Sequence, residues 1–581
     1  MASSPDKDPS ISKDAHHEHR EHLHSKVEAQ EAAFAAGEEK VAQLIAQMEQ
    51  QAAADKSPRA QGLRLSSLVL SNPKHYTWAL VAFASMGGLL SGLDQSIISG
   101  ANLFMPDDLS LTTRQNSLVN SGMPLGAVGG ALLLSPCNEY LGRRMAIIVA
   151  CVLYTIGAAL EAGSINFAMM VAARLVLGLG VGLEGGTVPV YVAETVERRL
   201  RGNLVSFYQF NIALGEVIGY AVGAMFTSVK GGWRYMLGSS VVFSTIMMVG
   251  MFFLPESPRY LLHRGKVLEA YHVWRRLRGV DSYESNREFY LMKVSVEAEE
   301  EEVHSSAVHK RFPWLDFFTE PRARRSIVYA NIMVFFGQFT GCNAILYYLS
   351  VLMNQIGFDK FQSNYMSLVG GGSLLLGTIP AVLYMERFGR RFWAISMLPG
   401  FFVGLVLIGV SYLFSTTTQL PAAEGIYLTG LILYYAFFGS YACLTWVIPS
   451  EVYPTYLRSY GMTSSDATLF LGAFLMTYNF SAMQDSMTPT GLLVGFYGGI
   501  AAVAWVYQIL FMPETKGKTL EEIDFIFRKP VSVVVRENIT STQQTVSSLV
   551  HLRWREVFTT VPPVQRVDGS LDASALEKQE K

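Results

Sequence analysis

Twelve apolar segments constrain this chain of 581 residues more than any other feature of its sequence. Each is long enough to cross the roughly 30 Å of hydrocarbon in a bilayer as a helix. Half of the residues are hydrophobic and only 16% are charged, whereas soluble domains carry about 25% charged residues. We therefore predict an all-α polytopic membrane protein with twelve transmembrane helices. The segments lie at approximately 76–101, 116–136, 145–162, 167–193, 203–226, 235–254, 326–352, 362–385, 392–415, 425–449, 460–482 and 491–512.

The charges between these segments predict how the chain is oriented. About 75 polar residues precede the first segment without a charged-then-apolar leader, so we expect that segment to direct insertion and the N-terminus to stay cytosolic. Nine arginines then fall in short inner loops and four cations in outer loops, as the positive-inside rule requires. The inner set is Arg143, Arg144, Arg198, Arg199, Arg201, Arg387, Arg390, Arg391 and Arg458; the outer set is Arg114, Lys230, Arg234 and Lys360.

The chain also repeats itself in two six-helix halves. The second segment is followed by "NEYLGRR" and the eighth, at the equivalent place, by "MERFGRR". Such a repeat around a central loop is typical of transporters that alternate access about a midplane site. We predict a cytosolic N-terminal tail (1–75), an N-terminal half (76–254), a cytosolic central loop (255–325), a C-terminal half (326–512) and a cytosolic C-terminal tail (513–581).

Five motifs resemble the sugar porter family of the major facilitator superfamily, and in particular its fungal sugar and polyol transporters. They are "RLVLGLGVGLEGGTVPVYVAETVERRLRG" from Arg174, "PESPRYLL" from Pro255, "GQFTGCNAILYY" from Gly337, "ERFGRR" from Glu386 and "PETKGKTLEEID" from Pro513. The resemblance runs from about residue 76 to 527. It implies a secondary transporter rather than an enzyme, with no cofactor beyond a coupling proton. The net charge of −2 gives no sign of a nucleic-acid partner, and the four cysteines lack the CxxC spacing of a zinc site, so we expect neither nucleic acid nor metal.

Two charged residues lie inside the predicted spans at similar depth. Asp94 and Arg174 are each eight residues, about 12 Å, from the outer end of their segments. Charges within a membrane are rarely left without a partner or a function, so we predict an ion pair that protonation of Asp94 would release. The resemblance implies that Asp94 is the proton acceptor. A purely structural pair is the alternative.

Neutral hydrogen-bonding groups near the midplane are candidates for binding a sugar, together with an aromatic face. The resemblance places five residues in this role: Gln209, Gln338, Asn343, Tyr347 and Trp446. We add Glu216 as a sixth candidate, because it follows Gln209 by seven residues and so lies on the same face of its helix. Membrane amides also join helices by hydrogen bonds, which is the structural alternative. The sequence departs from the family at Gly337, at Ala442-Cys443 and at Glu216, so the sequence leaves hexose, pentose, inositol and disaccharide open.

Charged residues at the inner ends of the segments form a predicted gating network. The network would pair across the two halves in one state and separate in the other, as a bistable element requires. It comprises Arg143, Arg144, Glu194, Arg201, Glu386, Arg390, Arg391, Glu451 and Arg458.

These observations predict a transporter that imports a sugar or polyol across the plasma membrane by proton symport. No GxxxxGK[ST] loop is present to drive it with ATP. We expect the monomer to be the transport unit, with the lipid bilayer and the small-molecule substrate as its partners. An uncoupled sugar facilitator and a transporter-like nutrient sensor remain as alternatives.

Overall fold

The computed structural model describes residues 39–51, 73–196, 201–278, 283–305, 313–414, 419–454, 457–516 and 529–551, with residues 518, 523, 526 and 527 between the last two ranges. The chain forms two compact units. Residues 1–80 and 253–310 make up the first unit, and residues 81–252 and 311–581 make up the second. The predicted transmembrane helices belong almost entirely to the second unit, which also holds the candidate site.

Each of the twelve predicted spans is helical. Those of the N-terminal half are α3 (Pro73–Ala101), α5 (Thr113–Tyr140), α6 (Arg143–Ala162), α7 (Phe167–Thr195), α8 (Arg201–Phe226), and α9 with α10 (Gly232–Gly238, Ser240–Phe253). Those of the C-terminal half are α15 with α16 and α17 (Pro321–Phe339, Cys342–Tyr347, Leu349–Ile356), α18 (Lys360–Phe388), α19 (Arg390–Ser411), α20 (Leu420–Val452), α21 (Arg458–Met487), and η4 with α22 (Gly491–Tyr497, Gly498–Phe511). A four-residue helix, α4 (Met105–Asp108), connects α3 to α5.

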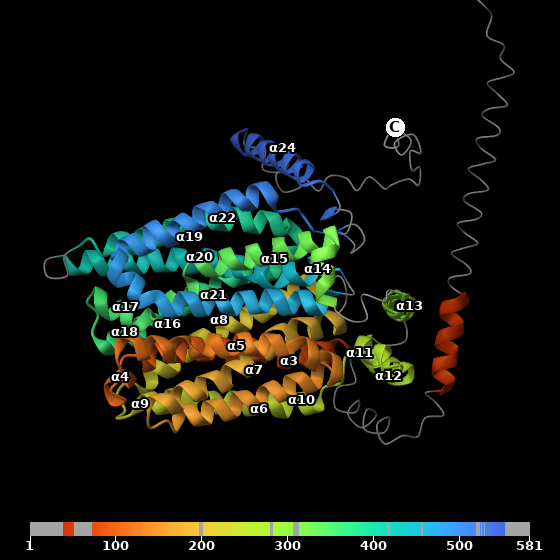
Figure 1. The fold of residues 1–581 in the computed structure, drawn as a ribbon, viewed down its shortest axis with the longest axis horizontal. Helices are drawn as coiled ribbons and strands as arrows, with labels where there is room; N and C mark the ends of the chain where they lie inside the picture. Colours follow the sequence, from red (N-terminus) through yellow and green to blue (C-terminus); the bar gives the residue numbers. More distant parts are fainter. Residues whose placement is uncertain are drawn as a thin grey trace, which may run out of the picture. The chain divides into compact units, whose positions relative to one another are not determined.

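Length and composition are sufficient for most of these helices to cross a membrane on their own. Among the described residues, nine helices pass this test, and the bent pair Pro321–Tyr347 and Leu349–Ile356 makes a tenth. The other two predicted spans, α8 and α21, are helices of 26 and 30 residues. Both lie in the middle of the bundle in Figure 1, where the orange and yellow N-terminal half meets the green and blue C-terminal half.

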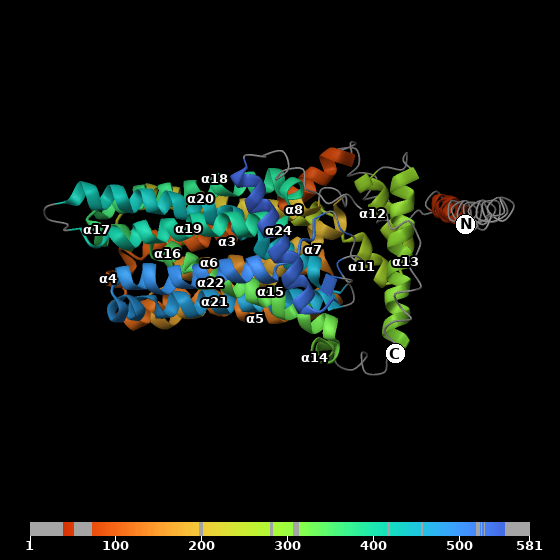
Figure 2. The ribbon, with the colours of Figure 1, turned by 90° about the horizontal axis from the view of Figure 1, so that it is seen from above.

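The two halves meet mainly along two pairs of helices, α5 with α21 and α8 with α18. α20 also packs against α8, and α21 against α7. In the view of Figure 2, turned by 90°, α5 and α21 again lie side by side. Polar contacts also cross the boundary, since Asn364 Nδ2 in α18 donates to Thr227 Oγ1 at 2.8 Å, just after α8.

The repeated Gly-Arg-Arg motif forms the same turn in both halves. Gly142 caps α6 with φ 90° and ψ 166°, and Gly389 caps α19 with φ 93° and ψ 159°. Glycine is required because residues with a Cβ rarely adopt this backbone conformation. Both turns place their arginines at one end of the bundle, which we call the arginine-rich end.

Glycines in α5 and α7 let these two helices approach closely. A Cβ on Gly182 would lie 2.0 Å from the carbonyl oxygen of Ala127, and one on Gly178 would lie 2.2 Å from that of Met123. Small residues four apart allow such backbone contact between membrane helices, where dispersion replaces the hydrophobic effect as the driving force. This packing holds Arg174, one turn before Gly178, inside the N-terminal half.

Much of the predicted central loop is helical and forms a small core within the first unit. Its helices are α11 (Pro258–His263), α12 (Val267–Arg278) and α13 (Tyr283–Ser305). α12 buries Tyr271, Trp274 and Leu277 at three-residue spacing, and Phe289 of α13 packs on both aromatic rings at 5.6 and 6.1 Å. Two short helical segments, Pro313–Leu315 and α14 (Asp316–Thr319), then lead into α15 in the second unit.

One helix after the last predicted span docks on the bundle. α24 (Val531–Val550) packs against α22. The buried side chain of Asn538 donates to the carbonyl oxygens of Leu510 and Met512 at 2.9 and 3.1 Å, and so caps the end of α22. Arg391 Nη2 donates in turn to the Asn538 carbonyl at 3.0 Å. The C-terminal segment is therefore partly tied to the arginine-rich end.

Candidate functional site

A pocket lies between the two halves, where the chain after α15 breaks. Gly341 adopts a φ of 83°, which separates α15 from α16, and α17 then continues at an angle of 70°. Broken helices of this kind expose backbone and side chains to a central site in transporters. The pocket is a cavity of about 60 Å³. Its lining comes from both halves: Ser91, Gln95, Pro124, Tyr208, Gln209, Ile212, Glu216, Gln338, Cys342, Asn343, Leu346, Tyr347, Leu374, Phe438, Ala442, Thr445, Trp446, Leu469, Phe470 and Ala473.

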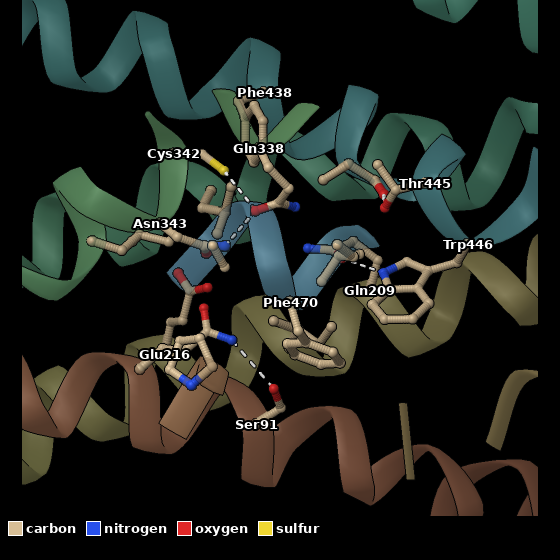
Figure 3. A pocket seen from close by; sticks show the side chains of 18 of the residues that line it. Ser91, Gln209, Glu216, Gln338, Cys342, Asn343, Phe438, Thr445, Trp446 and Phe470 are labelled. Atoms are coloured by element: carbon tan, nitrogen blue, oxygen red, sulfur yellow. Dashed lines mark hydrogen bonds between the residues drawn. The ribbon is translucent and has the colours of Figure 1, made fainter. Parts of the chain in front are cut away.

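Gln209 and Trp446 join the two halves across this pocket. The Trp446 Nε1 atom on α20 donates to Gln209 Oε1 on α8 at 2.9 Å. Tyr208 packs edge-on against the Trp446 ring, with centroids 5.0 Å apart. Figure 3 shows the indole of Trp446 beside the Gln209 amide. The ring thus presents an apolar surface and the amide a hydrogen-bonding group at the same wall, which suits a sugar or polyol ring.

A second pair of amides lies on the broken helix. Asn343 Nδ2 of α16 donates to Gln338 Oε1 of α15 at 2.5 Å, so the helix break brings two residues five apart into contact. The Cys342 thiol lies 3.9 Å from the same oxygen. Gln338 is 6% exposed. These amides satisfy each other in this state, and a substrate hydroxyl can replace either partner.

Glu216 is the acidic group of the pocket. It lies on α8, two turns after Gln209, and its carboxylate points into the cavity in Figure 3. The side chain is 1% exposed, and its Oε2 atom is buried without a hydrogen-bond partner among the described residues. Gln95 lines the same cavity and donates to Ser91 Oγ at 3.2 Å. An unpartnered buried carboxyl oxygen facing a cavity is a ready partner for a hydroxyl ligand.

All six predicted substrate residues therefore line one pocket, although their role in binding stays a prediction. Tyr347 is the least available of the six, because its hydroxyl donates to Met123 Sδ at 3.6 Å and only 1% of the residue is exposed. Six amide, hydroxyl or aromatic lining residues were not predicted: Ser91, Gln95, Tyr208, Phe438, Thr445 and Phe470. Gln95 could have been identified from the sequence as an amide beside Asp94, whereas the side-by-side placement of helices was needed to find the other five.

Asp94 is fully buried in the N-terminal half and accepts two hydrogen bonds. Tyr154 of α6 donates to its Oδ2 atom at 2.5 Å, and Ser240 of α10 donates to Oδ1 at 2.8 Å. The Tyr154 hydroxyl also lies 2.7 Å from the Leu90 carbonyl oxygen. These contacts hold the carboxyl group between three helices.

Arg174 forms its ion pair with Glu161, and not with Asp94 as predicted. Its Nε atom lies 3.4 Å from Glu161 Oε1, and neither side chain is exposed. The three guanidinium nitrogens have no hydrogen-bond partner among the described residues. Asp94 is close enough to interact electrostatically with the same guanidinium. The prediction considered only the depth of α3 and α7, whereas α6 lies beside both and supplies Glu161 and Tyr154. The arginine is therefore shared between two carboxyl groups.

Two groups of predicted gating residues form ion pairs at the arginine-rich end, each group within its own half. Arg143 pairs with Glu194 at 2.8 Å, and Arg390 pairs with Glu386 and Glu451 at 2.7 and 2.5 Å. Arg144 donates to the carbonyl oxygens of Met251 and Phe252.

Polar contacts at this end also join the two halves. Ser135 and Ser459 lie 3.3 Å apart, and Tyr460 of α21 hydrogen-bonds to Ser135 and Glu139 of α5. The side chain of Arg201 lies outside the described part of the chain. Ion pairing across the halves stays a prediction.

Comparison with known proteins identifies the family. Residues 80–527 match the family described as "Sugar (and other) transporter". This chain belongs to that family of sugar porters, as its motifs predicted, and it is a sugar or polyol transporter rather than an enzyme. The predicted fold class is confirmed by its likeness to a solved structure, that of the proton:xylose symporter XylE bound to 6-bromo-6-deoxy-D-glucose. The TM-score is 0.69 and the identity 25%, covering 79% of this chain and all of that one.

Several relatives transport myo-inositol according to their names. The chain is 72% identical to myo-inositol transporter FST1 of Gibberella moniliformis, over 84% of this chain and 85% of that protein. It is 31% identical to myo-inositol transporter 2 of Schizosaccharomyces pombe, over 80% of this chain and 84% of the relative. It is 28% identical to the human proton myo-inositol cotransporter, over 78% and 82% of the two chains.

Proposed function

We propose that this protein imports myo-inositol, or a closely related polyol, across the plasma membrane together with a proton. The observation that carries the proposal is the pocket between the halves, where Gln209, Gln338 and Asn343 provide amides and Trp446 an apolar ring face. A cyclic polyol presents hydroxyl groups around its whole edge, so it needs donors and acceptors on several sides. The names of the relatives support this substrate class.

Glu216 is the proposed determinant of the polyol preference. A carboxyl group accepts from hydroxyls more strongly than an amide does when it is ionised, and it donates when it is protonated. Its carboxyl group, with one oxygen unpartnered among the described residues, points into the cavity at the end away from the Trp446 ring in Figure 3. A substrate hydroxyl at this position would remove an unsatisfied buried acceptor.

Asp94 and Arg174 are proposed to couple the proton to substrate movement. Asp94 lies on α3 one residue from Gln95, which lines the pocket, so a change at the carboxyl group can reach the substrate through one helix. Protonation removes the negative charge that Asp94 shares with Glu161 around Arg174. The arginine then relies on Glu161 alone, which favours a different arrangement of α3, α6 and α7.

The arginine-rich end is proposed to face the cytosol, with both termini on the same side. The positive-inside rule supports this orientation. In this orientation the tail (1–75), the central loop (255–325) and the second tail (513–581) lie on the cytosolic side. The two halves (76–254 and 326–512) lie in the membrane. One chain supplies both walls of the pocket, so a monomer in the bilayer is a sufficient transport unit. The charged network at this end would open and close the cytosolic side.

Uptake of radiolabelled myo-inositol in cells that lack their own inositol and sugar carriers tests the proposal. We expect accumulation above the external concentration, loss of that accumulation when a protonophore is added, and weaker competition by glucose and xylose than by myo-inositol. Uptake that only equilibrates would indicate a facilitator, and absence of flux from protein present at the membrane would indicate a sensor. Tags at either terminus should be inaccessible from outside intact cells.

A further inference from the structure

Glu184 in α7 is a buried carboxylate that neither the pocket nor the Arg174 pair uses. Its side chain is 2% exposed, and its Oε1 atom has no hydrogen-bond partner among the described residues. The carboxyl group lies directly against Gly87 of α3, where a Cβ would be only 1.1 Å from Oε1. The absence of a side chain at Gly87 therefore creates the space that the Glu184 carboxyl group occupies.

The position of Gly87 places Glu184 relative to Asp94. Gly87 precedes Asp94 by seven residues, two turns along the same face of α3, which corresponds to about 10 Å. α3 begins at the arginine-rich end, so Glu184 lies between Asp94 and that end. Tyr154, which donates to Asp94, is also close enough to interact electrostatically with Glu184. The two carboxyl groups are thus neighbours along one route through the N-terminal half.

Among the residues that the structure describes, the groups placed around Glu184 on each packed helix are acidic or neutral. α6 presents Tyr154 and Cys151, and α8 presents Tyr208, each within electrostatic range. α3 presents Gly87 to the carboxyl group. On α5, Leu134 packs against Gly186, which follows Glu184 by two residues, or about half a turn of α7. None of the described ion pairs involves Glu184. A carboxylate charge buried without a cation is costly, so Glu184 is stable in this state in its protonated form.

The opposite half approaches α7 beside Glu184. Asp466 of α21 packs against the backbone of Gly185 and Gly186, where added Cβ atoms would lie 3.3 and 3.4 Å from its oxygens. Both Asp466 oxygens are buried without a hydrogen-bond partner among the described residues. Separation of the halves at the arginine-rich end would remove this packing and admit water to both acids. The stable protonation state of Glu184 would then change with the conformation of the transporter.

We propose that Glu184 is a second proton-binding residue of the transport cycle, which receives the proton that Asp94 releases and passes it to cytosolic water. The proposal rests on the proton symport proposed above. Glu184 first gives its own proton to water at the open cytosolic face and becomes a carboxylate; it then takes up the proton that Asp94 loses, so each transfer turns one acid into its carboxylate and the other carboxylate into its acid, and charge is conserved. Tyr154, which donates to Asp94 and lies within electrostatic range of Glu184, is the positioning residue for this transfer.

The variant Glu184→Gln tests the proposal. Asp94→Asn serves as the comparison at the first proton site, and Glu424→Gln serves as the control for the same chemical change elsewhere. The glutamine keeps the shape of the side chain and cannot release a proton. We expect net proton-driven uptake of myo-inositol to fall by about tenfold or more, which corresponds to ~1.4 kcal/mol in the barrier. Exchange of labelled for unlabelled myo-inositol at equal pH should stay within about twofold of the parent protein, because exchange can proceed without proton release. Glu424, a half-buried residue near the start of α20, should tolerate the same change.

The dependence on pH separates this proposal from a structural role. Net uptake by Glu184→Gln should lose its response to cytosolic pH and keep its response to external pH. If Glu184→Gln retains the net uptake and pH response of the parent while Asp94→Asn loses accumulation, the proposed role of Glu184 is overturned and the proposed role of Asp94 stays in place. Accumulation by Asp94→Asn would instead overturn the proposed coupling. If Glu184→Gln does not reach the membrane, Glu184→Asp decides: a shifted response to cytosolic pH supports the proposal, and an unchanged response opposes it.

Discussion

The amide pair on the broken helix allows a sharp test of the substrate pocket. Asn343 donates to Gln338 at 2.5 Å, and both side chains line the cavity. We expect Gln338→Ala and Asn343→Ala each to weaken the binding of substrate, since each removes a buried hydrogen bond and leaves the other amide with an unsatisfied group. That loss is worth about 1–3 kcal/mol. At 1.4 kcal/mol per factor of ten, the half-saturation concentration should rise by about fivefold to about 140-fold.

The double variant is the informative one, because the two amides satisfy each other. Removing the second amide no longer leaves a partner unsatisfied, so the combined loss should be smaller than the sum of the single losses by about 1 kcal/mol, or about fivefold in affinity. The half-saturation concentration for substrate exchange is measured for the parent, the two single variants and the double variant, at equal amounts of protein at the membrane. These four values complete a double-mutant cycle. Additive losses would refute the idea that the pair acts as one unit, and unchanged half-saturation would remove both residues from the site.

A second amide pair in the same protein is a matched control. Gln484 Nε2 donates to Gln355 Oε1 at 2.8 Å, but this pair is exposed and lies outside the pocket. Alanine at either position exchanges a hydrogen bond with protein for one with water, so the half-saturation should stay within about twofold of the parent. An effect as large as that at Gln338 would point to a general loss of folding rather than to the pocket.

Three further predictions follow from the buried groups and the helix packing. Asp94→Asn should abolish accumulation against a gradient and leave downhill exchange, because the amide imitates the protonated acid; continued accumulation in flux assays would contradict this. Glu216→Gln should change the ranking of competing polyols and keep proton-driven uptake, so an unchanged ranking in a competition panel would exclude Glu216 from the substrate contacts. Gly182→Val should destabilise the N-terminal half by about 1–3 kcal/mol or more, since its Cβ would lie 2.0 Å from a backbone oxygen; an unaltered melting temperature in detergent would contradict the packing described for α5 and α7.

The helices, their order and the family could be predicted from the sequence because a bilayer imposes strong local rules. An apolar run of about 20 residues must form a helix to satisfy its backbone within the membrane. The Gly-Arg-Arg turns also follow from local chemistry, since Gly142 and Gly389 are needed for a backbone that other residues avoid. The six predicted pocket residues lie together because their helices converge on the break near Gly341.

The partner of Arg174 was decided only by the tertiary structure. Depth along a helix can be counted from the sequence, and Asp94 and Arg174 do lie at similar depth. The rotation of each helix and the identity of its neighbours depend on side-chain packing across the whole bundle, which no local pattern encodes. That packing brings Glu161 of α6 to within 3.4 Å of the arginine and gives Asp94 two hydroxyl partners instead. In the same way, it places Glu184 against Gly87, nearly a hundred positions earlier in the chain.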